Sequence, residues 1–295
     1  MANENANPPA EQPPLPLRVF TPPTLGEVIT SSATNTPYTM AELLGEGSFG
    51  YVYACTDGWS NELAAKVLKA RNLPYEKIRD DAVAELTKLQ AFRHPTITYV
   101  YDAFEYRDTF YLITERCHRP LAEIIKSETF KGHLWLKPIA RCLLQAIHYL
   151  HVNKMVHQDV HLGNVLTAFV KDEMVPDDMS ITFKLADLGL TKVVSEVDAL
   201  NTMLAQWMLP PEVLKSEEFG LLDQRIDIYH AGLLLLQVYK GSTLHFSKED
   251  ILAGAPRKLA ETLPPPFNTA LSKALRRHSH LQTQSALEFW RDLYL

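Results

Sequence analysis

The sequence predicts an α+β protein whose first part is rich in strands and whose second part is mostly helical. Short runs of β-branched and aromatic residues, bounded by glycine or polar turns, recur between residues 38 and 114. From Leu121 onward, apolar residues recur at helical spacing, most clearly in Leu136–Val152 and Ala231–Val238. With 295 residues, the chain is long enough for one large domain or for two lobes that share a cleft.

Composition excludes several classes of protein. Apolar residues make up 46% of the chain and charged residues 22%, which is typical of a soluble globular protein. The net charge of −6 argues against nucleic acid or an anionic membrane as a general partner. Cys55, Cys117 and Cys142 are widely spaced and include no CxxC pair, so we expect a reducing, cytoplasmic location rather than a disulfide framework or zinc site. Residues 1–12 lack the apolar segment of a signal peptide, and no apolar run is long enough to insert into a membrane.

The N-terminal segment Met1–Pro37 is distinguished by its prolines, eight of the 19 in the chain. It shows no sustained helical or strand periodicity, so we interpret it as a disordered or partly polyproline II tail. Within it, Pro13-Pro14-Leu15-Pro16 could bind an SH3 or WW domain, although a plain flexible tail is the simpler interpretation. The folded domain is then expected to occupy residues 38–295.

A glycine-rich stretch opens the predicted domain. Gly45, Gly47, Gly50 and Val52 form a G-x-G-x-x-G-x-V pattern in which backbone amides can approach phosphate without hindrance from a Cβ. A dinucleotide-binding turn has the same glycine spacing, but it needs a helix directly after the glycines. The residues that follow, Tyr51-Val52-Tyr53, are strand formers, so the pattern favours a strand–turn–strand flap over a nucleotide.

Two charged residues follow the flap. Lys66 lies inside the apolar strand-like run Glu62–Lys69 and could reach phosphates, whereas the alternative is a surface lysine with a buried stem. The next helical run, Tyr75–Phe92, places Glu85 on its inner side. Glu85 could hold Lys66 by an ion pair, and a solvated glutamate is the alternative.

The polar loop His157–Asn164 carries a carboxylate five residues before a carboxamide. Asp159 could accept the proton of an incoming hydroxyl, and Asn164 could offer an oxygen to a magnesium ion that bridges phosphates. A polar helix-to-strand turn is the alternative. Asp187 follows the strand-like run Ile181–Ala186 and is a second candidate magnesium ligand, with an ordinary Asx turn as its alternative.

These features occur in one order along the chain: the glycine flap, the strand lysine, the helix glutamate, H-x-D-x-x-x-x-N, D-x-G, Pro210-Pro211-Glu212 and a D-x-x-x-x-G pattern at residues 227–232. The ordered set resembles the eukaryotic-type protein kinase family from about Tyr38 to Leu293. The resemblance implies a two-lobed fold, with an N-lobe at about 38–115 and a C-lobe at about 118–295. It also implies ATP and Mg²⁺ as cofactors and transfer of the γ-phosphoryl group to serine or threonine hydroxyls of protein substrates.

The resemblance also assigns roles residue by residue. It implies that Gly45, Gly47 and Gly50 cover the ATP phosphates and that Val52 and Ala64 pack on the adenine. It also implies that Lys66 contacts the phosphates and pairs with Glu85, that Thr114 is the gatekeeper, and that the hinge runs from Glu115 to Cys117. In the C-lobe it makes Asp159 the catalytic base and gives Mg²⁺ to Asn164 and Asp187. Asp227 is implied to anchor the backbone of the catalytic loop.

Several residues depart from the family pattern in the loop and the activation segment. Gln158 replaces the usual arginine, which makes the chain an atypical non-RD member and predicts activation that does not depend on a phosphate–arginine contact. His161 stands in place of a lysine near the γ-phosphate, and Ala205 in place of a threonine. Both changes could lower the rate.

A further departure concerns Glu212. Near the C-terminus, Thr283 occupies the approximate position of the arginine that pairs with this glutamate in the family, and Arg276 or Arg277 could substitute for it.

Two other functions remain open at this point. Gln158, His161 and Ala205 motivate a pseudokinase that acts as a nucleotide-binding scaffold. The loop from His157 to Leu166 also resembles that of aminoglycoside, choline and related small-molecule phosphotransferases. Those families generally lack the P-P-E and D-x-x-x-x-G patterns, so an active protein kinase is favoured.

Overall fold

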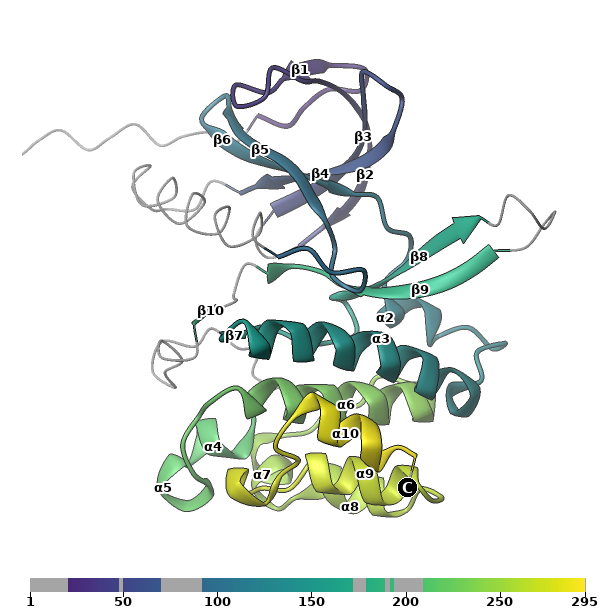
Figure 1. Ribbon diagram of the computed structural model, residues 1–295, viewed down its shortest axis with the longest axis vertical. Coiled ribbons are helices and arrows are strands. Elements are labelled where there is room, and N and C mark those ends of the chain that lie inside the picture. The colour runs from purple at the N-terminus through teal and green to yellow at the C-terminus, as the bar shows by residue number, and fades with distance from the viewer. Residues whose placement is uncertain are drawn as a thin grey trace, which may run out of the picture. The chain divides into compact units, whose positions relative to one another are not determined.

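The computed structural model describes residues 21–47, 50–69, 92–171, 179–188, 192–193 and 209–294. The chain divides into two compact units, one comprising Met1–Leu86 and Asp102–Ile113 and the other Thr87–Tyr101 and Thr114–Leu295. The predicted α+β class, with a strand-rich first part and a helical second part, is confirmed (Figure 1). Several predicted features lie outside the described residues, namely the helix that carries Glu85, the glycine of the D-x-G pattern, and Thr191, Ser195, Thr202 and Ala205.

The first unit is built on a curled six-stranded sheet with the order β1-β2-β3-β4-β6-β5 (Figure 1). Its strands are β1 Val28–Thr30, β2 Pro37–Glu46, β3 Gly50–Asp57, β4 Glu62–Leu68, β5 Val100–Tyr106 and β6 Thr109–Glu115. Strands β1 to β4 pair antiparallel in sequence order, as short connections allow.

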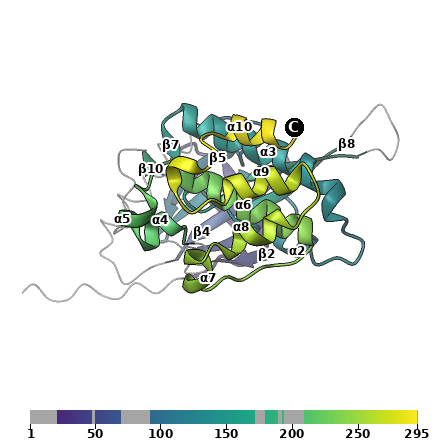
Figure 2. The ribbon, with the colours of Figure 1, turned by 90° about the horizontal axis from the view of Figure 1, so that it is seen from below.

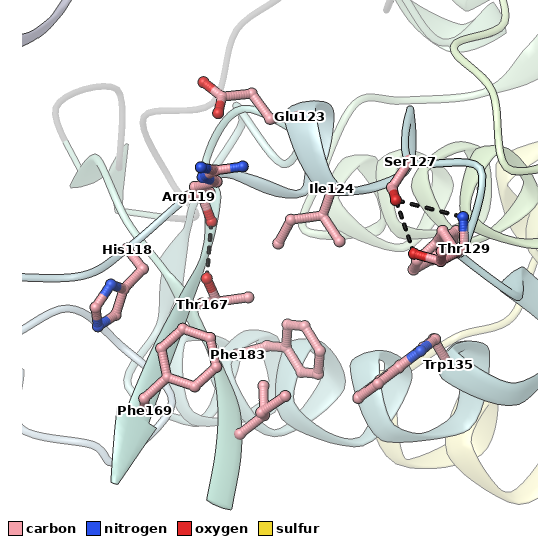
Figure 3. A pocket seen from close by; sticks show the side chains of 12 residues that line it. His118, Arg119, Glu123, Ile124, Ser127, Thr129, Trp135, Thr167, Phe169 and Phe183 are labelled. Carbon is pink, nitrogen blue, oxygen red and sulfur yellow. Dashed lines mark hydrogen bonds between the residues drawn. The ribbon is translucent and has the colours of Figure 1, made fainter. Parts of the chain in front are cut away.

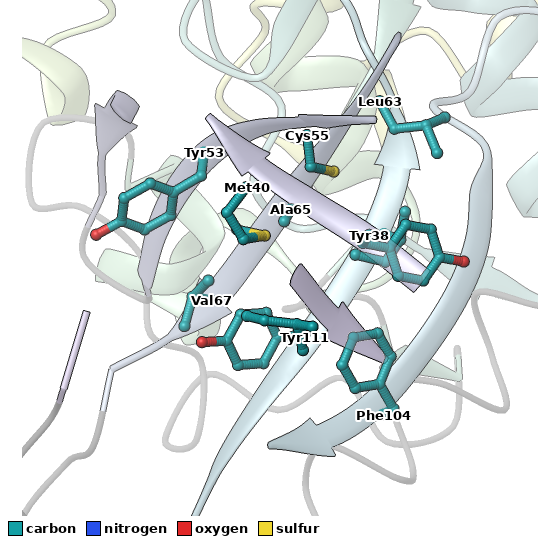
Figure 4. Close-up of a cluster of buried hydrophobic side chains, with 11 residues drawn as sticks. Tyr38, Met40, Tyr53, Cys55, Leu63, Ala65, Val67, Phe104 and Tyr111 are labelled. Atoms are coloured by element: carbon teal, nitrogen blue, oxygen red, sulfur yellow. The ribbon is translucent and has the colours of Figure 1, made fainter. Parts of the chain in front are cut away.

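Side chains alternate between the two faces of this sheet, and the two faces differ in what they contact. One face carries a buried apolar cluster that includes Tyr53, Val67 and Tyr111 (Figure 4). The rings of Phe104 and Tyr111 stack there with centroids 5.5 Å apart. Because side chains alternate along a strand, residues 52, 64 and 66 project from the opposite face. The apolar cluster therefore lies on one face of the sheet, and the candidate site residues 52, 64 and 66 lie on the other.

The N-terminal segment is ordered earlier than the sequence indicated. Val28–Thr30 forms β1, in which Ile29 pairs with Tyr38 and is fully buried in the cluster. The interpretation of Met1–Pro37 as a disordered tail is therefore wrong for residues 28–30. Pairing with β2 and the burial of Ile29 hold this segment, and three residues are too few to give a periodic pattern. Residues 1–20 lie outside the described part, so the prediction for them stays a prediction.

The hairpin between β5 and β6 is tight, because the strands extend to Tyr106 and resume at Thr109. Arg107 and Asp108 both have left-handed backbones, with φ of 48° and 57°. Two consecutive left-handed residues are characteristic of a two-residue type I′ turn, whose usual Asn-Gly signature is absent here.

The second unit is mostly helical. Its strands are β7 Met155–Val156, β8 Val165–Lys171, β9 Met179–Leu185 and β10 Lys192–Val193, and its helices are α2 Leu121–Ile124, α3 Gly132–Val152, α4 Pro211–Leu214, α5 Ser216–Phe219, α6 Arg225–Lys240, α7 Lys248–Leu252, α8 Ala255–Glu261, α9 Phe267–Ala274, the 3₁₀ helix η4 Ser279–Leu281 and α10 Ala286–Asp292. Helices α3 and α6 run side by side, with α10 packed on α3 and α9 on α6 (Figure 2). None of the described helices is both long and apolar enough to cross a membrane.

The long apolar runs are confirmed as the central helices of this unit. Leu136–Val152 lies within α3, and Ala231–Val238 lies within α6, where every residue from Ile226 to Val238 is buried. A helix that is apolar around its whole circumference belongs in a core. Helices α7, α8, α9 and α10 follow at the C-terminal end of this unit.

Candidate active site

A buried carboxylate fixes the loop between β7 and β8. Asp227, in the first turn of α6, is fully buried. Its Oδ2 accepts the backbone N–H of His157 at 2.9 Å and lies 2.9 Å from Nε2 of His151, and its Oδ1 accepts the N–H of Gln158 at 2.8 Å. Gln158 has a left-handed φ of 69°. Burial opposes the charge of Asp227, but these hydrogen bonds and the neighbouring His151 lower its pKa overall.

Substitution of Asp227 by asparagine should lower the free energy of unfolding by about 2 kcal/mol. An asparagine oxygen can accept from one backbone N–H, but its NH₂ group then faces another donor in a site without water access. Urea unfolding followed by tryptophan fluorescence measures the loss. The exposed Glu217→Gln change, also a carboxylate-to-amide substitution, should leave stability nearly unchanged. Equal stability of both variants would contradict an anchoring role for Asp227.

His157 links the loop to the strand that precedes Asp187. Its Nε2 lies 3.2 Å from the carbonyl oxygen of Ala186, and its Nδ1 accepts the N–H of Asp159 at 3.2 Å. Burial lowers the pKa of His157, although nearby carboxylates oppose that shift. The ring is therefore neutral, with its proton on Nε2, and acts as a spacer between the loop and Ala186.

Asp159 projects from this fixed loop with its carboxylate held in place. Nδ2 of Asn164 donates to Oδ2 and to the backbone carbonyl of Asp159, both at 2.9 Å. Nε2 of His161 lies 3.6 Å from Oδ2, and Nδ1 of His161 accepts the N–H of Gly163 at 3.0 Å. Burial raises the pKa of Asp159, but His161, His157 and His230 outweigh burial and lower it overall. The carboxylate is thus ionised at neutral pH and able to accept a proton.

A backbone hydrogen bond joins the same loop to the residue before Asp187. The N–H of Ala186 donates to the carbonyl of Asn164 at 2.7 Å, so the residue after it, Asp187, adjoins the loop. Because the amide nitrogen of Asn164 is bound by Asp159, Oδ1 is the atom it can offer a cation. Within the described ranges, no three His, Cys, Asp or Glu side chains gather as a metal site. One carboxylate and one amide oxygen suit Mg²⁺, which takes its other ligands from water and phosphate.

The flap and strand lysine belong to the first unit. Val52 pairs with Lys66 across β3 and β4, and Ala64 lies two residues away on the same face. A Cβ on Gly50 would clash with the carbonyl of Val67, so this position needs glycine. The N–H of Gly47 donates to the carbonyl of Gly50 at 2.9 Å, which closes the turn. The structure thus places Val52, Ala64 and Lys66 on the sheet face away from the core.

A second lysine, Lys69, steadies the start of the flap. Its Nζ donates to Oε1 of Glu46 at 2.6 Å and to the carbonyl of Gly47 at 2.9 Å. Gly45 has open space where a Cβ would lie, so sterics at this glycine do not explain its presence.

The predicted hinge begins with an ion pair that sequence reasoning did not find. Both carboxylate oxygens of Glu115 lie 2.8 Å from Nζ of Lys184 in β9, and Oε1 also accepts the N–H of Tyr99 at 2.9 Å. The side chain of Glu115 is therefore occupied, and only its backbone carbonyl is left for a ligand. Burial raises the pKa of the Cys117 thiol to about 12, so this cysteine stays protonated and unreactive.

Sequence reasoning missed His151, His230 and Lys184, which touch or influence site residues. Only His230 carries a signal in the sequence, since it lies three residues after Asp227 on the same helix and so shares its face. His151 and Lys184 meet their partners through space, across 76 and 69 residues.

Of the departures in the 157–164 loop, His161 is partly exposed and Gln158 is buried. Gln158 is 1% exposed, and its side-chain Nε2 has no hydrogen-bond partner among the described residues. A neutral amide cannot supply the charge of an arginine to a phosphate.

Glu212 at the start of α4 is 1% exposed, and Thr283 is fully buried. Arg276 and Arg277 do not take the place of the family's arginine partner. They donate instead to the carbonyls of Leu281 at 3.0 Å and Leu252 at 2.7 Å, because helix ends supply acceptors nearer to them. Burial raises the pKa of Glu212 to about 7.

Comparison with known proteins gives an independent view of this site. Residues 38–288 match the family model described as protein kinase domain. The chain is 27% identical over 223 residues to CTD kinase subunit alpha of Saccharomyces cerevisiae, covering 74% of this chain and 39% of that protein. It is 26% identical over 210 residues to serine/threonine-protein kinase TIO of Arabidopsis thaliana, covering 69% and 15%. It is 27% identical over 261 residues to serine/threonine-protein kinase 10 of Danio rerio, covering 82% and 25%. The chain therefore spans well under half the length of these relatives.

Proposed function

Because the chain belongs to the protein kinase domain family, we propose that it transfers the γ-phosphoryl group of ATP to serine or threonine hydroxyls of protein substrates. The observation that carries this proposal is the arrangement of the 157–164 loop, in which one buried anchor, Asp227, orients Asp159 and brings Asn164 beside the residue that precedes Asp187. The names of the relatives support serine and threonine as acceptors.

Each residue of the site has a role in this proposal. Asp159 accepts the hydroxyl proton of the protein substrate, and His161 and Asn164 hold its carboxylate in place. Asn164 and Asp187 hold Mg²⁺, which when bound neutralises charge on the phosphates. The remaining residues bind and position ATP as the family resemblance implies, through the flap, the adenine-contacting residues, the lysine pair, the gatekeeper and the hinge: Gly45, Gly47, Gly50, Val52, Ala64, Lys66, Glu85, Thr114, Glu115 and Cys117.

A transfer assay tests the proposal. When the full chain is incubated with radiolabelled ATP and Mg²⁺, generic protein substrates should incorporate label. The Asp187→Asn variant should reduce incorporation at least about 100-fold, because a neutral amide binds Mg²⁺ more weakly than a carboxylate does. Glu217→Gln, at an exposed position of α5, should retain wild-type activity. Undiminished transfer by Asp187→Asn would contradict the assignment of Mg²⁺ to this residue.

Two other functions follow from specific residues. A pseudokinase is favoured by Gln158 and His161, which replace the usual arginine and lysine, and it would bind ATP analogues while wild type and Asp187→Asn show equal background transfer. A small-molecule phosphotransferase would label sugars, choline or aminoglycosides but never protein. Mass-spectrometric mapping of phosphosites after incubation with ATP distinguishes a protein kinase from the other two functions, and the small-molecule assay separates those two.

We also propose that activity does not need a phosphate on the segment between Asp187 and Glu212. Gln158 cannot pair with a phosphate, so simultaneous alanine substitution of Thr191, Ser195 and Thr202 should leave more than about half of the activity. Initial rates of the triple variant and wild type, after phosphatase treatment of both, measure this. A loss of tenfold or more would reveal a phosphate switch that uses another cation.

The proposed setting is cytoplasmic, with ATP and protein substrates as partners and neither nucleic acid nor membrane. The wide spacing of the three cysteines and the lack of a CxxC pair support a reducing compartment. An SH3 or WW domain remains a possible partner of the proline-rich segment.

A further inference from the structure

The hairpin of β8 and β9 contacts the chain at both ends of the predicted hinge, residues 115–117. On the C-terminal side, the N–H and the hydroxyl of Thr167 both donate to the carbonyl of Arg119, at 3.1 and 3.0 Å (Figure 3). On the N-terminal side, both carboxylate oxygens of Glu115 lie 2.8 Å from Nζ of Lys184. Thr167 belongs to β8 and Lys184 to β9, so one pair of strands holds the hinge.

Lys184 points away from a cavity that the same hairpin lines. Phe183, the residue before it in β9, lines a cavity of about 450 Å³ together with Thr167 of the facing strand (Figure 3). Because side chains alternate along a strand, Lys184 projects from the opposite face of the hairpin. The register of the hairpin therefore directs the ammonium group to Glu115 and not into the cavity.

The backbone that carries Lys184 is fixed. Lys184 pairs with Leu166 across the hairpin. The N–H of the next residue, Leu185, donates to the carbonyl of Thr96 at 2.8 Å, and its carbonyl accepts the N–H of Thr98 at 3.0 Å. The lysine therefore extends from a strand that is held by neighbours on both of its edges.

Glu115 is held through its side chain as well as through its backbone. Its Oε1 accepts the N–H of Tyr99 at 2.9 Å, and its own N–H donates to the carbonyl of Tyr99 at 2.9 Å. The side chains of Lys184 and Glu115 are 15% and 20% exposed, whereas those of the surface pair Lys215–Glu218 are 55% and 52% exposed. Exposed pairs contribute little, but a shielded pair with two short contacts fixes the side chain that it binds.

We propose that Lys184 is a positioning residue that sets the preference of the hinge for adenine over guanine. It acts through Glu115, whose carbonyl oxygen is the backbone group left for a base, since its N–H is bound to Tyr99. Adenine carries an amino group where guanine carries a carbonyl oxygen. A fixed carbonyl of Glu115 accepts a hydrogen bond from the first base and repels the second. The inference rests on the proposed function, from which it takes the adenine contact of the hinge.

Nucleotide binding tests the proposal without any need for phosphoryl transfer. The full chain is titrated, with Mg²⁺ present, with fluorescent non-hydrolysable analogues of ATP and of GTP. Lys184→Met should bind the ATP analogue about tenfold more weakly, because the base contact is no longer held in place. It should bind the GTP analogue no more weakly than wild type does, because the phosphate contacts are unchanged. The preference for adenine therefore falls about tenfold, which a general loss of stability would not produce.

Two further lysine variants serve as controls. Lys184→Arg keeps the charge and can offer two N–H groups to the carboxylate, so its affinities should stay within about threefold of wild type. Lys273 pairs with Glu288 at 2.7 Å and with Asp292 at 2.8 Å, in helices that carry no site residue. Lys273→Met thus removes a similar ion pair, and it should bind both analogues as wild type does. Thermal unfolding of each variant checks that the fold is kept.

A double variant tests whether Lys184 acts through Glu115. Glu115→Gln alone should also weaken binding of the ATP analogue, and its combination with Lys184→Met should weaken it no more than about twofold beyond the weaker single variant. Losses that add in full would overturn the route through Glu115. An unchanged adenine preference in Lys184→Met would overturn the role of Lys184 and leave the proposed function standing. A wild-type chain that binds neither analogue would overturn the proposed function, and this inference with it.

Discussion

Replacement of Asp159 by asparagine is expected to lower kcat for protein phosphorylation by about 10³-fold, within the range found for loss of a general base. The amide keeps one oxygen to accept the hydrogen bond that Asn164 donates at 2.9 Å, so the loop should keep its shape. It has no basic oxygen to accept the substrate proton. Steady-state kinetics with a peptide phosphorylated by the wild-type chain measures the loss.

The control measurements separate chemistry from binding and folding. Affinity for an ATP analogue and the melting temperature should stay within about twofold and a few degrees of wild type, because Asp159 neither contacts ATP in our proposal nor anchors the loop. Glu217→Gln should show wild-type kinetics. If Asp159→Asn retained more than a tenth of the activity, proton transfer to this carboxylate would not limit the reaction, and the assignment of the base would be wrong.

Long periodic segments made much of the fold predictable. Helices α3 and α6 are buried on many sides, so each appears in the sequence as a long run of apolar residues. Short elements left no such pattern. Strand β1 has only three residues, and its one buried residue, Ile29, cannot form a periodic pattern. Helix α8 begins with Ala255-Pro256, and a proline suggests the end of a helix although it also fits the first turn.

The site was predictable where chemistry requires fixed spacing along one loop. Asp159 and Asn164 hydrogen-bond each other because five residues of loop return the chain on itself, and this spacing is visible in the sequence. Contacts between distant segments were not predictable, such as Lys184 with Glu115. Such pairs have no fixed spacing in the sequence, because only the folded backbone brings the two residues together.

Substitution of Glu212 by glutamine is expected to stabilise the protein at alkaline pH. Burial raises the pKa of Glu212 from 4.5 to about 7, so the folded state holds its proton more tightly than the unfolded state does. A raised carboxyl pKa means that stability is greatest below about pH 4.5 and falls as pH rises through about 7. The difference of about 2.5 units corresponds to about 3 kcal/mol lost by the wild type at about pH 8.5. Glutamine has no proton to lose, so the variant should match wild type near pH 5 and exceed it by up to about 3 kcal/mol near pH 8.5.

Urea unfolding at both pH values measures the effect, with the exposed Glu217→Gln as a control that should show no difference at either pH. The physical cause is burial, which the charge of Arg225 and a hydrogen bond with Gln282 offset only in part. Thr283 is fully buried, Arg276 and Arg277 bond to helix-end carbonyls, and the guanidinium of Arg225 is held by Asp223 at 2.6 Å. A wild-type protein that is equally stable at both pH values would show that a cation does reach Glu212. A variant that loses stability near pH 8.5 would show the same, because only an ionised and paired glutamate is better than a neutral amide in this position.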